Sequence, residues 1–485
     1  MFFNSIDFAI FLPVVFVLYW FVFNKSIRVQ NALLVAASYF FYGLWDWRFL
    51  FLILFSTIID FTVAKAIARQ SDKKQKKILL FISLAVNLGL LGFFKYCNFF
   101  IDSFVDVFSF FGANFNAQRL DIILPVGISF YTFQTLSYTI DVYKGKLEPT
   151  KDFVAFTAFV SFFPQLVAGP IERATNLLPQ FYKKRFFNYH NSIDGLKQIL
   201  WGLFKKIVIA DNAAVFANDI FNNYNDYNGS TLVIGAVLFA FQIYGDFSGY
   251  SDIAIGTSRL FGFNLMQNFA FPYFSRDIAE FWRRWHISLS TWFRDYLYIP
   301  LGGSKGGTSM KVRNTFIIFI VSGFWHGANW TFIFWGFLNA LFFLPLLLFS
   351  KNRANLDVVA KHKYFPNFRE IMAMASTFVL TCFAWIFFRA NNMDHAISYI
   401  KGIFFQGLFT SPISDIWTIN TGYQIVLYVI LLTFFIVMEW INRDKQYGLQ
   451  LHVRSKVLRW LLYYFVILSC FMMNGIQQEF IYFQF

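Results

Sequence analysis

The sequence has few charged residues and few cysteines. Only 14% of its 485 residues are charged, whereas soluble domains average about 25%. Together with 57% hydrophobic residues, 22% aromatic residues and a mean hydropathy of +0.51, this shortage excludes a soluble globular protein, a coiled coil and a disordered chain. The three cysteines, Cys97, Cys382 and Cys470, are far apart and match no metal-binding or redox spacing.

The apolar residues occur in long unbroken runs, which excludes the short alternating segments of an outer-membrane β-barrel. An all-α polytopic membrane protein is therefore predicted, with roughly 11 to 13 membrane segments, some of them re-entrant or broken. We expect a single membrane domain over residues 1–485. The candidate spans are 5–23, 29–45, 49–68, 78–94, 122–140, 153–167, 196–210, 232–250, 315–349, 371–388, 423–440 and 458–473.

The net charge of +14 comes from basic residues that cluster in short stretches between the apolar runs. This distribution is typical of membrane topology signals and not of nucleic-acid binding, so no nucleic acid is expected as a partner. The stretch Arg69–Lys77, RQSDKKQKK, is predicted to be a cytoplasmic loop. Counting back through three spans places Met1 outside the cytoplasm, in a first helix that we expect to be retained.

A histidine interrupts the longest apolar run. His326 lies within residues 315–349, TFIIFIVSGFWHGANWTFIFWGFLNALFFLPLLLF, between Gly323 and Gly327. Thirty-five residues exceed one crossing, so the helix is predicted to break here and to line a cavity. A structural histidine bonded to a carbonyl is the alternative, but an ionisable group inside a membrane segment is more often functional.

A second histidine lies in the charged and aromatic stretch NFAFPYFSRDIAEFWRRWHISLSTWFRDYLYIPLGG, residues 268–303. Read as one amphipathic helix, this stretch directs His286 to its apolar face and Arg284 to the opposite face. Such a helix commonly lies at the cytoplasmic interface with its basic residues toward lipid headgroups. Because an unpaired imidazole is costly on an apolar face, we expect His286 to face an internal cavity.

Two further stretches carry polar residues in an apolar context. QIYGDFSGYSD, residues 242–252, contains Asp246 and Asp252 beside glycines and suggests a second helix break facing a polar interior. A cation site is the sharper alternative, but the pattern is not specific for one, and no metal is expected. Gln134 is interpreted either as a binding residue or as a helix-packing hydrogen-bond donor, of which packing is favoured.

Two histidines in a membrane cavity suit proton abstraction from a hydroxyl as it attacks an activated acyl group. Burial keeps such an imidazole neutral and able to act as a base. The chain has no G-x-S-x-G nucleophile motif and no H-E-x-x-H zinc pair. The residues therefore favour acyl transfer without a seryl intermediate or a metal.

Several of these segments closely resemble the membrane-bound O-acyltransferase family. The similar motifs are RRWHISLSTWFRDYLYIPLGG at 283–303, SGFWHGANWTFIFWG at 322–336, SFFPQLVAGPIER at 161–173, YGDFSGYSDIAIG at 244–256 and the closing FIYFQF. The resemblance is strongest to the subgroup that acylates bacterial surface polymers such as alginate and teichoic acid. It runs in matching order along nearly the whole chain, with the motif core at about 122–350.

The resemblance implies a helical core with a tunnel across the bacterial inner membrane. It implies a cytoplasmic thioester donor, acetyl-coenzyme A or an acyl carrier protein, and no permanently bound cofactor. It further implies an extracytoplasmic SGNH-like acyltransferase partner and an exported, alginate-like polysaccharide as acceptor. The family's catalytic histidine corresponds to His326, and its second histidine corresponds to His286.

Other side chains are assigned supporting roles as hypotheses. Asn329 is expected to bond the imidazole or the oxyanion, and the arginines near His286 are expected to attract donor phosphates or an acidic carrier. Anchoring to lipid headgroups explains each arginine equally well. The full set of candidate substrate- or donor-binding residues is Asn329, Trp325, Trp330, Arg283, Arg284, Arg294, Asp295, Asp246 and Gln134.

The sequence leaves three alternatives open. D-alanyl transfer to a teichoic-acid-type polymer has the same chemistry with another acyl group. A transporter of a polysaccharide or lipid-linked precursor would use the broken helix as a substrate site, although such proteins often contain internal repeats and none is visible. An inactive scaffold for an exported transferase would keep the fold and tolerate loss of either histidine.

Overall fold

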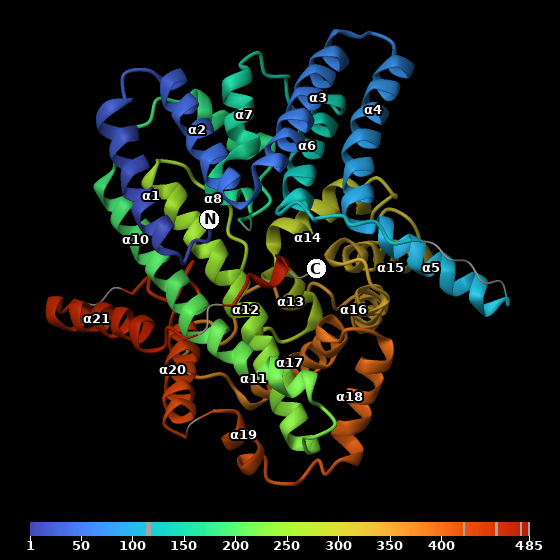
Figure 1. The fold of residues 1–485 in the computed structure, drawn as a ribbon, viewed down its shortest axis with the longest axis vertical. Coiled ribbons are helices and arrows are strands. Elements are labelled where there is room, and N and C mark those ends of the chain that lie inside the picture. Colours follow the sequence, from blue (N-terminus) through green and yellow to red (C-terminus); the bar gives the residue numbers. More distant parts are fainter. Residues whose placement is uncertain (113–117, 168, 421, 452–453, 476–477, 484–485) are drawn as a thin grey trace. The chain divides into compact units, whose positions relative to one another are not determined.

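The computed structural model describes residues 1–112, 118–167, 169–420, 422–451, 454–475 and 478–483 (Figure 1). The chain is 73% helical and its described part contains no β-strand, which confirms the all-α prediction. It forms two compact units, the first made of residues 1–192 and 257–266 and the second of residues 193–256 and 267–485. The two terminal residues of the closing motif, Gln484 and Phe485, lie outside the described residues.

The first unit is built from helices that follow one another closely along the chain. They are α1 (Ile6–Val17), η1 (Leu18–Val22), α2 (Ile27–Asp46), η2 (Trp47–Phe49), α3 (Leu50–Arg69), α4 (Lys73–Leu91), η3 (Gly92–Tyr96), α5 (Cys97–Phe110), α6 (Ile128–Tyr143), α7 (Phe153–Ser161), α8 (Phe163–Leu166), α9 (Ala174–Leu177) and η4 (Leu178–Tyr182). Helix α3 packs against α4, α6 and α7, and the four lie together in Figure 1.

A buried carboxyl group joins three of these helices. Asp60 of α3 accepts hydrogen bonds from Ser83 and Asn87 of α4, at 2.5 and 2.9 Å, and from Thr139 of α6, at 3.0 Å. These side-chain hydrogen bonds are needed because lipid cannot form hydrogen bonds with a polar group. Gln134 of α6 donates to the carbonyl oxygen of Phe159 in α7, which agrees with the helix-packing interpretation.

The second unit holds both histidines of interest. Its helices are α10 (Tyr189–Leu203), η5 (Phe204–Ala210), α11 (Asp211–Asn222), α12 (Gly229–Leu260), η6 (Pro272–Phe274), α13 (Ile278–Arg284), α14 (Ile287–Phe293), η7 (Arg294–Tyr298), α15 (Thr308–His326), α16 (Trp330–Leu348), α17 (Phe368–Arg389), α18 (Met393–Phe405), α19 (Ile413–Ile419), α20 (Gly422–Ile441), α21 (Lys456–Met472) and η8 (Ile481–Phe483). The first residues of α10 and the last of α12 belong to the first unit.

Helices α15 and α16 form a closely packed hairpin whose turn follows His326. The predicted break in the 315–349 run is thus confirmed. The helices approach so closely that a side chain on Gly323 would collide with the carbonyl oxygen of Phe332, and one on Gly336 with that of Phe319. Glycine at both positions therefore fixes the hairpin that carries His326.

The described residues contain six helical stretches long and apolar enough to cross a membrane. They are Ile27–Arg69, Lys73–Phe110, Gly229–Leu260, Trp330–Leu348, Phe368–Arg389 and Gly422–Ile441. The first two have 43 and 38 residues, about twice the 20 residues that one crossing needs. The protein is a multi-pass membrane protein, and the expectation of 11 to 13 segments stays a prediction.

Candidate active site

His286 lies at a break between two short helices and not within one amphipathic helix. Helix α13 ends at Arg284, Trp285 is extended, and His286 has a left-handed backbone, with φ 42° and ψ 55°. The single-helix prediction is therefore wrong, since a helical face pattern cannot reveal a backbone reversal inside it. His286 is fully buried, and the expectation that it faces an internal cavity stays a prediction. Left-handed non-glycine residues cost on the order of 1 kcal/mol and cluster at functional sites.

Asn268 holds the break in place. Its side-chain oxygen accepts the Ser288 backbone N–H at 3.2 Å and the Ser288 hydroxyl at 2.8 Å, and it lies 3.1 Å from His286 Nδ1. A backbone N–H can only donate, so the shared atom is the amide oxygen. Nδ1 of His286 therefore carries a proton, and Nε2 is the basic nitrogen of the neutral ring. Burial holds the pKa of His286, which lies outside the six long apolar helices, well below its ordinary value.

His326, the last residue of α15, is 3% exposed and approaches His286. The ring centroids of the two histidines are 6.5 Å apart. The tip of α15 thus brings together two imidazoles that are forty residues apart in sequence. The surrounding aromatic rings lie between 5.0 and 5.6 Å from the His326 ring and belong to Trp325, Trp335, Phe388 and Tyr482.

The C-terminal segment contributes a residue that the sequence analysis did not single out. The Tyr482 ring lies 5.6 Å from His326 and 6.4 Å from His286, and it also contacts Phe247 of α12 at 4.4 Å. The closing FIYFQF motif was used only to support the family resemblance. Nothing local in that motif indicates that it folds back onto histidines far away in sequence.

A buried ion cluster fixes this C-terminal segment. The Lys206 ammonium is 2.8 Å from both Asp211 and Asp246, and it donates to the Gln478 carbonyl oxygen at 3.0 Å. Asp246 also accepts the Ile481 backbone N–H at 2.7 Å. Asp246, predicted as a substrate-binding residue, thus positions the residue next to Tyr482. A neighbouring pair, Lys205 and Asp252, is 2.6 Å apart, so the second carboxylate has a lysine as its partner. The predicted helix break at 242–252 is wrong, because α12 runs without interruption from Gly229 to Leu260 and its carboxylates are paired inside the helix bundle.

A cavity of about 330 Å³ is lined by residues of α13, α14, α15 and α16, and neither histidine is among them. Ser322, one helical turn before His326, lines it, as does Trp282. The Trp282 ring is 5.7 Å from that of Trp335, which in turn contacts His326. The cavity therefore leads to the aromatic layer beside the imidazole.

Three arginines line this cavity: Arg283, Arg294 and Arg353. Arg294 is paired with the adjacent Asp295 at 2.7 Å, and Arg283 donates to backbone carbonyl oxygens. Arg353 is exposed and forms no ion pair with any described residue. The sequence analysis missed Arg353 because it lies outside every motif, in the connection between α16 and α17.

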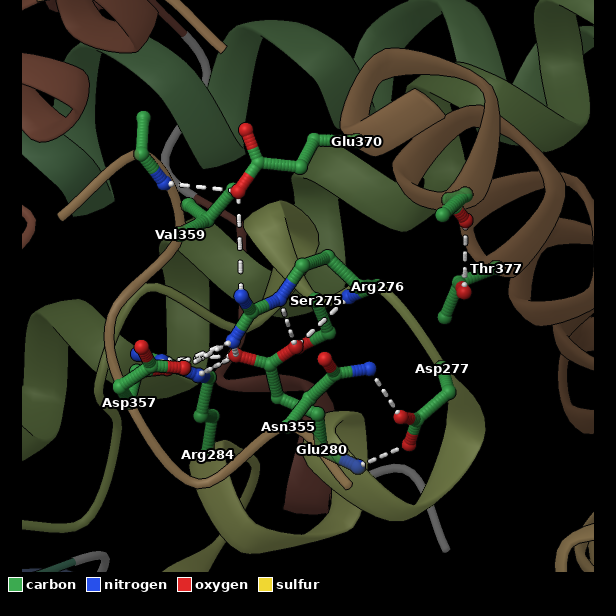
Figure 2. Close-up of polar contacts among 12 residues, drawn as sticks. Ser275, Arg276, Asp277, Glu280, Arg284, Asn355, Asp357, Val359, Glu370 and Thr377 are labelled. Carbon is green, nitrogen blue, oxygen red and sulfur yellow. Dashed lines mark hydrogen bonds and ion pairs between the residues drawn. The ribbon is translucent and has the colours of Figure 1, made fainter. Parts of the chain in front are cut away.

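Arg284, expected to bind donor phosphates, belongs to a separate network centred on Arg276. Glu280 is 1% exposed and pairs with Arg276 at 3.0 Å and with Arg284 at 2.8 Å. Figure 2 shows that Arg276 also reaches Asp357 and Glu370, at 3.1 and 3.8 Å. The Arg276 guanidinium holds the pKa of Asp357 below its usual value.

This network fastens the connection 351–367 onto α13. Asn355 donates to Asp277, the N-terminal cap of α13, at 2.6 Å (Figure 2). Arg283 donates to the carbonyl oxygens of Asn352 and Asn355. Because Arg353 lies in the fastened connection, the network also sets the position of the exposed arginine at the cavity.

Two other predicted residues lie at the turn after His326. Asn329 caps α16 by accepting the Thr331 N–H at 3.0 Å, and its amide donates to the Asn391 carbonyl oxygen at 2.8 Å. Trp330 is 56% exposed, whereas Trp325 is buried, with its ring 6.1 Å from His286. Among Asn329, Trp330 and Trp325, it is Trp325 whose ring lies next to both histidines.

Known proteins similar to this chain include several acyltransferases. The sequence model of the MBOAT, or membrane-bound O-acyltransferase, family matches residues 150–393, which include both histidines. The probable alginate O-acetylase of Pseudomonas aeruginosa is 37% identical over 91% of this chain and 82% of its own. The peptidoglycan O-acetyltransferase of Helicobacter pylori is 38% identical over 81% and 77%. The teichoic acid D-alanyltransferase of Bacillus subtilis is 27% identical over 57% and 71%.

Substitution Arg276→Gln is expected to release the connection 351–367 from α13. Loss of a charge-assisted hydrogen bond is worth about 1.5 kcal/mol, so backbone amide exchange there should rise about tenfold. Hydrogen–deuterium exchange with mass spectrometry measures this. Arg294→Gln is the matched control, because Arg294 pairs with its own neighbour. Equal exchange in Arg276→Gln and the unaltered protein would contradict the assigned role.

Proposed function

The chain belongs to the membrane-bound O-acyltransferase family, and on that premise we propose that it O-acetylates an exported polysaccharide with an acetyl group from a cytoplasmic thioester. The observation that carries the proposal is the meeting of His286 and His326 beside a cavity lined by arginines. Relatives named as O-acetylating enzymes match more of the chain, at higher identity, than the D-alanyltransferase does. This favours acetyl over D-alanyl transfer.

The cavity of about 330 Å³ is the proposed donor site. Coenzyme A and the phosphopantetheine arm of a carrier protein both end in a thioester and carry phosphate. Arginine binds phosphate well because its planar guanidinium donates two parallel hydrogen bonds. Arg353 and Arg294 are the proposed phosphate contacts, and the thioester lies toward Ser322 and the aromatic layer. Arg283 and Arg284 hold the wall of the site.

The two imidazoles supply the base. A buried neutral histidine can take the proton of an attacking hydroxyl as its oxygen adds to the thioester carbonyl carbon. The carbon–sulfur bond then breaks, and the imidazolium returns the proton to the leaving thiolate. We assign this role to His326, while His286, with its tautomer set by Asn268, presents Nε2 to orient the reacting groups.

The Tyr482 phenol is the proposed first acceptor. Its ring contacts both imidazoles, and its hydroxyl can donate a proton to a base. An acetyl ester on the phenol oxygen would be transferred onward to the external transferase, in a second step that restores the phenol. Such a relay suits a reaction whose donor and acceptor lie on opposite sides of a membrane.

The proposed setting is the bacterial inner membrane, with Met1 outside the cytoplasm and the donor cavity opening to the inside. A carrier protein or coenzyme A delivers the acetyl group there, and an SGNH-like transferase outside passes it to the polysaccharide. The basic loop 69–77 supports this orientation, since such loops are retained in the cytoplasm.

His326→Ala is expected to lower the ester content of surface polysaccharide about 10²- to 10⁴-fold, the usual contribution of a general base. The measurement is mass spectrometry of the acid that mild base releases, in cells with matched membrane abundance of the protein. His190→Ala, which alters an exposed histidine, is the control. Ester retained in His326→Ala but lost in the deletion would make the protein a scaffold or conduit. An ester content that is unchanged in both the His326→Ala variant and the deletion would exclude a surface polysaccharide ester as the product.

Arg353→Gln is expected to raise KM for the thioester about fivefold with kcat nearly unchanged, as for loss of about 1 kcal/mol from an exposed charge pair. Initial rates in membrane vesicles, at varied acetyl-coenzyme A or acetylated carrier protein, separate the two constants. Lys351→Gln removes the same charge two residues away and does not line the cavity. A KM that rises equally in both variants would assign the effect to general surface charge.

Tyr482→Phe retains the aromatic ring and removes the hydroxyl. If the phenol carries the acetyl group, transfer to the polysaccharide should stop, while the protein still folds and still binds the thioester. Surface ester and thioester binding are measured in the same membranes. Normal ester content would show direct transfer from the thioester to the final acceptor, and would remove Tyr482 from the mechanism.

A further inference from the structure

A second cavity, of about 450 Å³, lies in the first unit and shares no lining residue with the cavity described above. Its lining comes from the end of η1 with the residues that follow, and from the basic and aromatic stretch 183–187, KKRFF. The cationic residues that line it are Lys25, Lys184 and Arg185. No carboxylate lines it.

Arg185 carries a buried charge without a carboxylate partner. It is 8% exposed, and its hydrogen bonds go to Asn31 at 2.8 Å and, at 3.4 Å, to Gln30 and the Gln180 carbonyl oxygen. Its buried Nε has no hydrogen-bond partner among the described residues, and none of their carboxylates pairs with it. Arginine stays protonated in proteins. Because a buried charge is costly when uncompensated, the site favours an anion.

Three exposed phenylalanines also line the cavity. Phe21, Phe186 and Phe187 line it and are 73%, 71% and 51% exposed. Phe21 continues the apolar surface of α1, on which Ile10, Val14 and Val17 are also exposed. Aromatic residues beside lysines are typical of the level where lipid headgroups meet hydrocarbon. A soluble anion would leave these rings without an apolar neighbour.

We propose that this cavity binds the phosphate headgroup of an anionic phospholipid, with Arg185 at its base and Lys25 and Lys184 at its mouth. The exposed phenylalanines contact the acyl chains. Basic pockets on the cytoplasmic side of membrane proteins bind such headgroups. The lipid would join the segment after η1 to the segment before α10, and this role is independent of the acyltransferase reaction.

The test uses the full-length protein, stripped of lipid in detergent, and measures phospholipid binding by native mass spectrometry. The probes are palmitoyl-oleoyl phosphatidylglycerol, phosphatidylcholine with the same chains, and inorganic phosphate. The variant Lys25→Gln/Lys184→Gln changes two exposed side chains, so its folding should be retained. Lys73→Gln/Lys74→Gln, at the exposed start of α4, is the control with the same charge change.

Phosphatidylglycerol is expected to bind at one tight site and to raise the melting temperature. Each lysine removed should weaken binding about fivefold, and the double cavity variant about 25-fold, since a basic residue near anionic lipid contributes about 1 kcal/mol. Arg185→Gln should weaken binding further, and Arg185→Lys should restore part of it.

Three results would overturn the proposal. Equal binding of phosphatidylcholine would show that the cavity does not select lipids by the charge of their headgroup. An equal loss in the Lys73→Gln/Lys74→Gln control would show general attraction to the basic surface. Stabilisation by inorganic phosphate that matches phosphatidylglycerol would assign the cavity to a soluble phosphate and not to a lipid.

Discussion

Each break in an apolar helix frees backbone groups that must find partners inside the protein, because lipid provides none. The two histidines depend on how this chain meets that requirement. At the first break, one amide oxygen of Asn268 satisfies Ser288 and bonds His286. At the second, Asn329 caps the helix that follows His326. Both imidazoles are held at helix ends, His286 at the start of α14 and His326 at the end of α15, and their close approach follows from the two breaks.

Charged side chains near the site pair with one another. One ion cluster, of Lys206, Asp211 and Asp246, lies beneath the C-terminal segment. A second, of Arg276, Glu280 and Asp357, lies beside the cavity. The histidines themselves are surrounded by aromatic rings, and burial lowers the pKa of His286.

Particular residues show what the local sequence pattern could predict and what it could not. The apolar runs predicted the all-α membrane architecture, and one histidine among glycines predicted the break at His326. The helical pattern around His286 correctly indicated burial but failed at the backbone, because a left-handed residue leaves no trace in hydrophobic periodicity. Arg284 looked equivalent to Arg283, yet Glu280, four residues earlier, pairs with it. The (i, i+4) spacing of this pair on α13 is visible in the sequence, whereas the contacts of Arg276 with Asp357 and Glu370 depend on packing that the sequence does not display.

The sequence by itself determined the fold class, the two histidines and the family, because hydropathy, residue type and motif order are properties of the chain alone. The tertiary structure decided which groups meet. It brought Tyr482 to histidines more than 150 residues away, placed Arg353 at the cavity, and left Arg185 buried without a carboxylate. Contacts of this kind arise when separate helices pack, and their specificity comes from close approach and from the satisfaction of buried polar groups.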